Sequence, residues 1–171
     1  MVDAFKELIA NQFEAALCTL NTCIEECPPT VWDAPVANLA FCQAVFHALF
    51  YTDCYLGPDT ESLKQQAFHR ENPDFFRDYE ELEDRKQQQM YDKESTIKYM
   101  ASCRRKASEV IAAETAETLS ARCGFDWLPF SRAELYVYNI RHIQHHAAQL
   151  ILRLRLSTDV NIPWARSGWR A

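Results

Sequence analysis

Apolar positions recur every three or four residues in four stretches of the chain, the spacing that places side chains on one face of an α-helix. The first predicted helix covers residues 2–26 and ends before Pro28-Pro29, because proline cannot donate a helical hydrogen bond. The second, residues 39–56, has Asn38 as its expected N-cap and is apolar almost all round, which indicates a central helix. The expected inner stripe of the first helix is Phe5, Leu8, Ile9, Gln12, Phe13, Ala16, Leu17, Leu20 and Ile24.

Two further helices are predicted in the second half of the chain. One covers residues 93–113, with Asp92 as N-cap. The other continues from Ser131 to about Leu156, and Ser131 with Glu134 forms a capping-box sequence. The expected inner positions of residues 93–113 are Ile97, Met100, Ala101, Ala107, Val110 and Ile111.

The segments between these helices complete the predicted architecture. Residues 58–91 are rich in polar side chains, and we expect short helices around 59–69 and 74–89 there. Trp32 is expected to close one end of the core, and the tail with Trp164 and Trp169 to pack across an end. The pattern predicts one all-α domain over residues 1–171, a four-helix bundle with a long crossover excursion between helices two and three.

Composition removes several other classes of protein. The 171 residues include only three glycines, which argues against phosphate-binding loops and turn-rich β folds. The net charge of −6 disfavours nucleic acid as a partner. With no secretory signal pattern and no run of about 18 apolar residues, we expect a cytoplasmic protein without a membrane contact.

The seven cysteines do not form a recognisable framework. Their number is odd and no pair has C-x-x-C spacing, so we expect neither disulfides nor a cysteine zinc site. Most are expected to be small core residues. Cys54 lies seven residues after His47 and could face the same site as that histidine, but we expect it to pack in the core.

The histidines carry the chemistry that the sequence suggests. His142 and His146 are four residues apart and share a helix face, so two imidazoles can meet one metal ion. His47, in the most apolar helix, is the third candidate ligand. His145 faces the adjoining sector, so we expect it to support the ligands from behind or to lie at the surface rather than to be a fourth ligand. His69 is expected to be exposed within the polar excursion. Buried, hydrogen-bonded histidines without metal are the competing interpretation.

Two common helical metal motifs do not fit. Position 143 is Ile rather than the Glu of the zincin proteases, and none of these histidines follows a Glu by three residues as in di-iron bundles. An all-nitrogen site remains, suited to a divalent transition metal such as Zn or Ni with open positions for water or substrate. Neighbouring side chains that could orient the imidazoles are, by helix phase, Gln43, Tyr51, Tyr138 and Gln149.

These features together resemble the DinB / YfiT-like metalloenzyme superfamily. The matching residues are Trp32, Pro35 and His47, the segment His142–Leu150, and the tail around Ile162-Pro163-Trp164. The resemblance implies an up-down-down-up bundle, the metal triad His47, His142 and His146, and a homodimer. It also implies chemistry with low-molecular-weight thiols in some relatives.

Where relatives commonly carry Arg-Gly, this chain has Ala147-Ala148, and the missing Arg is expected to remove a contact with an anionic substrate. The sequence leaves three functions open: a metal-dependent transferase or hydrolase, a metal-free interaction or stress-response module, and a sensor that uses the cysteines. It also leaves open whether residues 58–91 cover the site.

Overall fold

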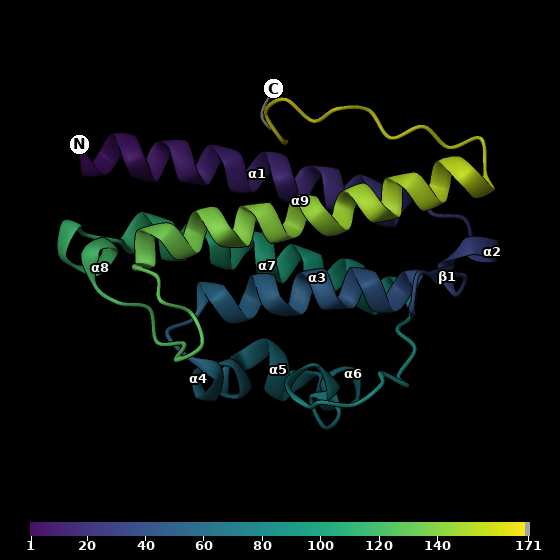
Figure 1. Ribbon diagram of the computed structural model, residues 1–171, viewed down its shortest axis with the longest axis horizontal. Helices are drawn as coiled ribbons and strands as arrows, with labels where there is room; N and C mark the ends of the chain where they lie inside the picture. Colours follow the sequence, from purple (N-terminus) through teal and green to yellow (C-terminus); the bar gives the residue numbers. More distant parts are fainter. Residues whose placement is uncertain (170–171) are drawn as a thin grey trace.

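Four long helices form the body of the protein in a computed structural model that describes residues 1–169 (Figure 1). They are α1 (Val2–Glu26), α3 (Phe41–Leu56), α7 (Lys93–Ala113) and α9 (Arg132–Ser157). α1 and α3 each pack against both α7 and α9. Figure 1 shows α1 and α9 running one way, and α3 and α7 the other. The predicted all-α, up-down-down-up four-helix bundle is confirmed.

Side-chain caps explain where two of these helices begin. The Asp92 carboxylate accepts the backbone N–H of Ser95 at 2.8 Å before α7, and the Ser131 hydroxyl accepts that of Glu134 at 3.2 Å before α9. Each cap satisfies an N–H group that has no partner within its helix. Both N-caps are therefore those that the sequence predicts.

The second long helix begins two residues later than expected. Leu39–Ala40 forms strand β2, which pairs antiparallel with β1 (Pro35–Val36). The prediction of Asn38 as N-cap is wrong, because Ala40 occupies that position and its N–H donates to the Gln43 side chain at 2.9 Å. The short helix α2 (Pro29–Trp32) precedes this hairpin.

Trp32 closes the neighbouring end of the core, as predicted. Its side chain is buried, and its indole N–H donates to the carbonyl of Tyr91 at 2.7 Å. The ring also packs against Phe41, the first residue of α3. The segment between α1 and α3 is thus hydrogen-bonded, through Trp32, to Tyr91 at the end of the crossover.

The inner face of α7 agrees with the prediction in part. Met100, Ala107 and Ile111 are buried as predicted, but Ile97 and Ala101 are exposed. The polar Tyr99, which apolarity alone does not select, is buried as well, and its hydroxyl donates to the buried Asp53 of α3 at 2.9 Å. In α1 the predicted stripe is buried at Ile9, Phe13 and Leu17, but Leu8 is exposed.

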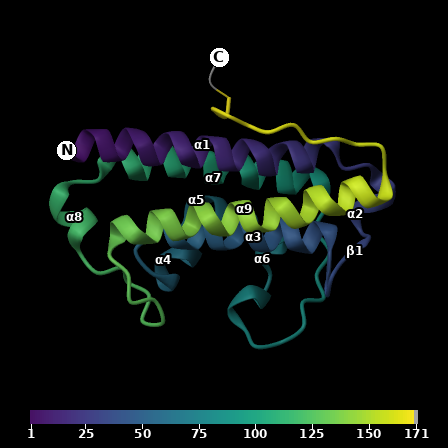
Figure 2. The same ribbon diagram turned by 45° about the horizontal axis from the view of Figure 1, so that its top comes forward.

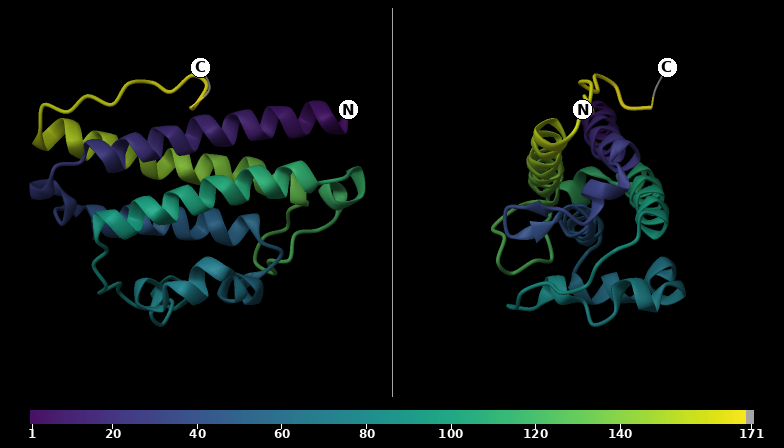
Figure 3. Two further views of the ribbon diagram at one scale, coloured as in Figure 1. Left: turned by 180° about the vertical axis from the view of Figure 1, so that it is seen from behind. Right: turned by 90° about the vertical axis from the view of Figure 1, so that its right-hand side faces the viewer.

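The crossover lies along the outer side of α3 (Figures 1 and 3). It contains the helices α4 (Thr60–Gln65), α5 (Ala67–Glu71) and α6 (Pro73–Phe76), and the 3-10 helix η1 (Glu80–Leu82). The prediction of a helix over 74–89 is wrong. The backbone turns to positive φ at Arg77 (45°) and Tyr79 (59°), which a right-handed helix cannot include.

His69 is buried, so the prediction that it is exposed is wrong. Its side chain stacks on Phe76, with ring centroids 3.6 Å apart, and its Nε2 lies 2.7 Å from the Asp53 carboxylate. Its Nδ1 lies 3.1 Å from the Tyr79 hydroxyl. The crossover is therefore attached to α3 through a buried polar contact.

The tail after α9 runs back along α1 instead of crossing an end of the bundle (Figures 1 and 2). Trp169 lies beneath the Arg104 guanidinium, 4.0 Å from the ring centroid, and Arg104 is itself bonded to Glu14 of α1. Gly168 has φ of 66°, and a Cβ there would lie 2.7 Å from the Glu14 backbone. These contacts direct the tail along the side of the bundle. α8 (Ala116–Ser120) lies between α7 and α9.

Within the described residues, no helix combines the length and the apolarity needed to cross a lipid bilayer.

Candidate metal centre

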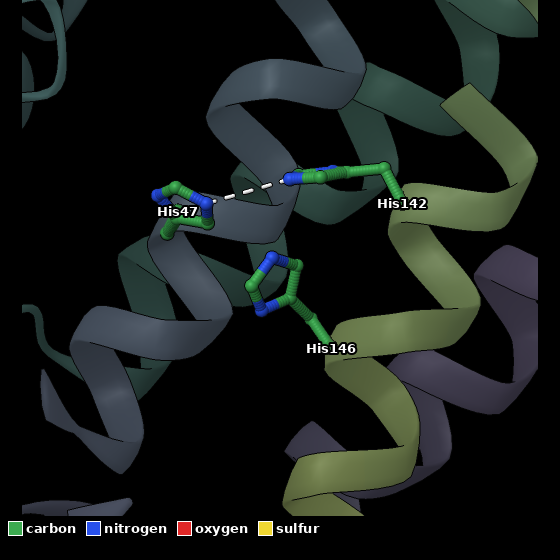
Figure 4. A group of neighbouring side chains, drawn as sticks. All are labelled: His47, His142 and His146. Atoms are coloured by element: carbon green, nitrogen blue, oxygen red, sulfur yellow. Dashed lines mark hydrogen bonds between the residues drawn. The ribbon is translucent and has the colours of Figure 1, made fainter. Parts of the chain in front are cut away.

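Three imidazoles meet between α3 and α9 (Figure 4). His47 lies near the middle of α3, and His142 and His146 lie one turn apart on α9, which packs against it. One ring nitrogen from each histidine lies within 4.8 Å of those of the other two. The structure thus brings together the three histidines that the sequence selects.

The distances suit a late first-row metal ion. The Nε2 atoms of His47 and His142 are 3.4 Å apart. Two nitrogens bound ~2.1 Å from a tetrahedral zinc ion are separated by about 3.4 Å. The rings of His47 and His142 also stand at similar centroid distances from His146, 4.6 and 4.5 Å. Together with the all-imidazole donor set, this spacing fits a divalent transition metal.

Glu81 of the crossover fixes the orientation of His47. The Nδ1–H of His47 donates to Glu81 Oε2 at 2.8 Å, and Nε2 of the same ring faces Nε2 of His142. The second oxygen of this carboxylate accepts from the Gln87 side chain. Sequence reasoning missed Glu81, because it lies in an irregular segment that carries several similar carboxylates.

A second set of contacts orients His146. Its Nδ1–H donates to Oε1 of Gln149 at 3.1 Å, and Nε2 of Gln149 lies 3.2 Å from Nε2 of His145. Gln149 and His145 therefore stand behind His146, on the side away from His47. His142 has no such partner among the described residues, and its Nδ1 is buried without a hydrogen bond.

The environment favours neutral imidazoles. Burial, together with the neighbouring His146 and His47, lowers the pKa of His142 to about 3. Burial and the neighbouring His47 and His145 lower the pKa of His146 to about 4. Both rings are therefore uncharged at neutral pH and keep a lone pair that a metal ion can bind.

The other predicted neighbours occupy different positions. The Tyr51 hydroxyl donates to the backbone carbonyl of Glu81 at 2.8 Å, which holds the crossover near His47. Tyr138 packs against Tyr55 and does not bond to an imidazole in the structure. Gln43 points away from the histidines and donates to the carbonyl of Gln89 at 3.0 Å.

The triad opens into a pocket of about 590 Å³. Four aromatic residues, three carboxylates and one leucine complete its lining: Tyr51, Tyr55, Trp127, Tyr138, Glu81, Glu83, Asp84 and Leu82. The carboxylates and Leu82 belong to the crossover, so residues 58–91 form one wall of the site. The pocket is large enough for a small organic molecule beside the histidines.

Ala147 does not belong to the lining of this pocket. It is fully buried, and its carbonyl is near the Cys23 thiol of α1. In this chain the side chain at position 147 therefore makes no contact with a molecule in the pocket.

The cysteines lie apart from the pocket lining described here. All seven are free thiols, and all but Cys18 are buried. Burial raises the pKa of the Cys23 and Cys54 thiols to about 12, which disfavours the reactive thiolate. The structure gives no support to a sensor in which cysteines act with the histidines.

Fold and site together define a helical bundle protein with a three-histidine cluster on two adjacent helices. A family profile described as the DinB superfamily matches residues 12–150, which include all three histidines. Since the match covers well over half of the chain, the protein belongs to the DinB superfamily. Neither the curated proteins nor the solved structures gave a match.

Proposed function

We propose that the protein binds one divalent transition metal ion, Zn or Ni, through His47, His142 and His146. One observation carries the proposal: three imidazoles from two packed helices converge in the lining of one open pocket. Three protein ligands leave at least one coordination position for an exogenous group. The proposed activity is that of a metal-dependent transferase or hydrolase that acts on a small molecule.

When bound, such a metal lowers the pKa of a thiol or a water molecule and so supplies a nucleophile. The chain's own residues prepare the site for it. Glu81 and Gln149 accept from Nδ1–H of His47 and His146, so Nε2 is the nitrogen of each ring that is left for a metal ion. Tyr51, Tyr55 and Tyr138 line the pocket beside the histidines.

Metal content tests this proposal directly. Protein purified without chelator is expected to carry about one metal ion per chain by elemental analysis. His142→Ala removes one of three ligands and should reduce the metal content several-fold, whereas Arg105→Ala, an exposed position on α7, should leave it unchanged. Full metal content in His142→Ala, in a protein that remains folded by circular dichroism, would contradict the proposal.

The competing candidate is a metal-free interaction or stress-response module. Its support is the contact between His47 and His142, because 3.4 Å is also within reach of a hydrogen bond between imidazoles. This candidate predicts protein without metal even after incubation with Zn or Ni. The elemental analysis above therefore separates the two.

We also infer that two copies of the chain associate as a homodimer. Three large apolar side chains are exposed where α9 meets the tail: Leu152 is 58% exposed, Leu156 74% and Trp164 81%. Leu152 and Trp164 line one hollow together with Ile162. Exposed apolar surface of this kind is typical of protein–protein contacts.

A further inference from the structure

The pocket beside the three histidines has an acidic wall. Glu81, Glu83 and Asp84 come from the crossover, and no Lys or Arg belongs to the lining that the structure describes. The surrounding stretch, residues 78–86, contains five carboxylates and two basic residues. A ligand that enters this pocket therefore meets negative charge on the crossover side.

These three carboxylates differ in the hydrogen bonds and ion pairs that they make within the protein. Glu81 is bonded to His47 and Gln87, and Glu83 to Arg85 at 2.5 Å. Asp84 is exposed and takes part in no ion pair within residues 1–169. Asp84 is thus the carboxylate that remains available to a charged group on a ligand.

A second part of the lining, on α3, α9 and the segment before α9, is aromatic. Tyr55 is the centre of this group: its ring centroid lies 5.5 Å from that of Tyr51 and 5.6 Å from that of Tyr138. Trp127, which is 57% exposed, extends the wall toward solvent. Aromatic faces attract ammonium groups electrostatically, and most strongly where water is partly excluded.

From these two walls we infer that the pocket selects a small molecule with an ammonium or quaternary ammonium group. This inference rests on the proposed function, because the reactive end of the same molecule would approach the metal held by the three histidines. The cation would lie between Asp84 and the rings of Trp127 and Tyr55. A ligand whose distal group is a carboxylate or sulfonate would meet repulsion at the same place.

A matched series of thiols tests the inference on the Co²⁺-loaded protein. Thiocholine, 2-mercaptoethanol and 2-mercaptoethanesulfonate share a two-carbon thiol and differ in the charge of the distal group. Thiolate binding to Co²⁺ is followed by its charge-transfer absorption, and dissociation constants are calculated for the thiolate form of each compound. We expect thiocholine to bind roughly tenfold more tightly than 2-mercaptoethanesulfonate, since cation–aromatic contacts contribute about one to two kcal/mol in partly desolvated sites.

Two variants test whether the preference for the cationic thiol arises from the acidic and aromatic residues of the pocket. Asp84→Asn and Trp127→Leu should each reduce the ratio of the two dissociation constants several-fold. Asp159→Asn, which removes one exposed negative charge at the end of α9, should leave the ratio unchanged. If neither wall variant changes the ratio, the preference arises from the thiols or the metal, and the inference is wrong.

The outcomes for the two proposals are distinct. A protein that binds no Co²⁺ contradicts the metal-binding function and the inference that depends on it. A protein that binds Co²⁺, but takes 2-mercaptoethanesulfonate as tightly as thiocholine, contradicts the cation preference alone.

Discussion

At the scale of single residues, the geometry of the metal centre depends on groups behind the ligands as well as on the ligands. His47 is held by a charged acceptor, Glu81, and His146 by a neutral one, Gln149. A carboxylate behind an imidazole fixes its tautomer and makes the opposite nitrogen a better electron donor. Of the two, Glu81 should therefore have the larger effect on metal binding.

Glu81→Gln tests this role. We expect the dissociation constant for Zn²⁺ to rise by roughly 10- to 100-fold, the usual effect of removing such a partner, while one metal still binds at saturation. Competition with a chromophoric chelator measures the constant. Glu117→Gln, an exposed charge on α8, is the matched control and should bind Zn²⁺ like the unaltered protein. Equal affinity in Glu81→Gln would show that the His47 contact does not orient a ligand.

The three histidines were predictable from sequence for a simple physical reason. Residues four apart on a helix share a face, so His142 and His146 had to point the same way, and His47 stood out in an apolar helix. Glu81 was not predictable, because the crossover has no period that distinguishes its carboxylates. His69 did leave a signal: Asp53 in the apolar helix α3 required a buried partner.

At the scale of elements, a buried polar cluster is among the contacts that fix the crossover to the bundle. The carboxylate of Asp53 on α3 is hydrogen-bonded to three side chains. They are Tyr99 and Lys106 of α7 and His69 of α5. Breaking such a contact leaves a buried group without its partner, which costs more than the bond contributes. The position of the acidic pocket wall therefore depends on this cluster.

His69→Phe tests the attachment while keeping an aromatic ring against Phe76. We expect a loss of about 1–3 kcal/mol in the free energy of unfolding, measured by urea denaturation at neutral pH. Arg70→Ala, the exposed neighbour on α5, should lie within about 0.5 kcal/mol of the unaltered protein.

The difference in the free energy of unfolding between the unaltered protein and His69→Phe should depend on pH, because Asp53 is ionised. Burial alone raises the pKa of Asp53, but the His69 hydrogen bond and the Lys106 charge outweigh it and hold the pKa below the ordinary 3.8. The folded state is stabilised by this ionised carboxylate above pH 3.8, and the stabilisation is lost as the pH falls through the folded pKa. The difference between the two proteins should shrink from pH 7 toward pH 3, and a constant difference would argue against the pairing.

Sequence patterns located the long helices better than the short ones. Periodicity over five or more turns and two side-chain caps defined the bounds of α7 and α9 closely. The segment 74–89 lacked such signals. A continuous helix does not form there, because Arg77 and Tyr79 adopt positive φ. The inner face of α7 was predicted only in part, since Tyr99 also lies inside, where it donates to a polar partner.

At the scale of the whole molecule, the proposed homodimer would use the apolar surface at the end of α9. Replacing Leu152 by Asp places a charge within the proposed contact and should convert a dimer into a monomer, as sedimentation velocity would show. Met90→Asp, an exposed apolar position in the crossover, serves as the control and should stay dimeric. A monomeric unaltered protein at micromolar concentration would contradict the homodimer.

The overall architecture was predictable because few arrangements bury four amphipathic helices with one long connection. The course of the tail was not, because it depends on a specific contact between Arg104 and Trp169. The contact of Arg104 with Trp169 and the close approach of Gly168 to Glu14 together place the chain's last described residues.

The metal ligands and the acidic wall come from separate parts of the chain. The ligands lie on packed helices that must keep their sequence to fold, whereas the wall lies on a connection that tolerates change. Evolution can therefore alter the molecule that is recognised without rebuilding the centre that reacts with it, provided that the glutamate behind His47 is kept. An exchange of residues 82–86 between members of the superfamily should transfer ligand preference and leave metal affinity intact.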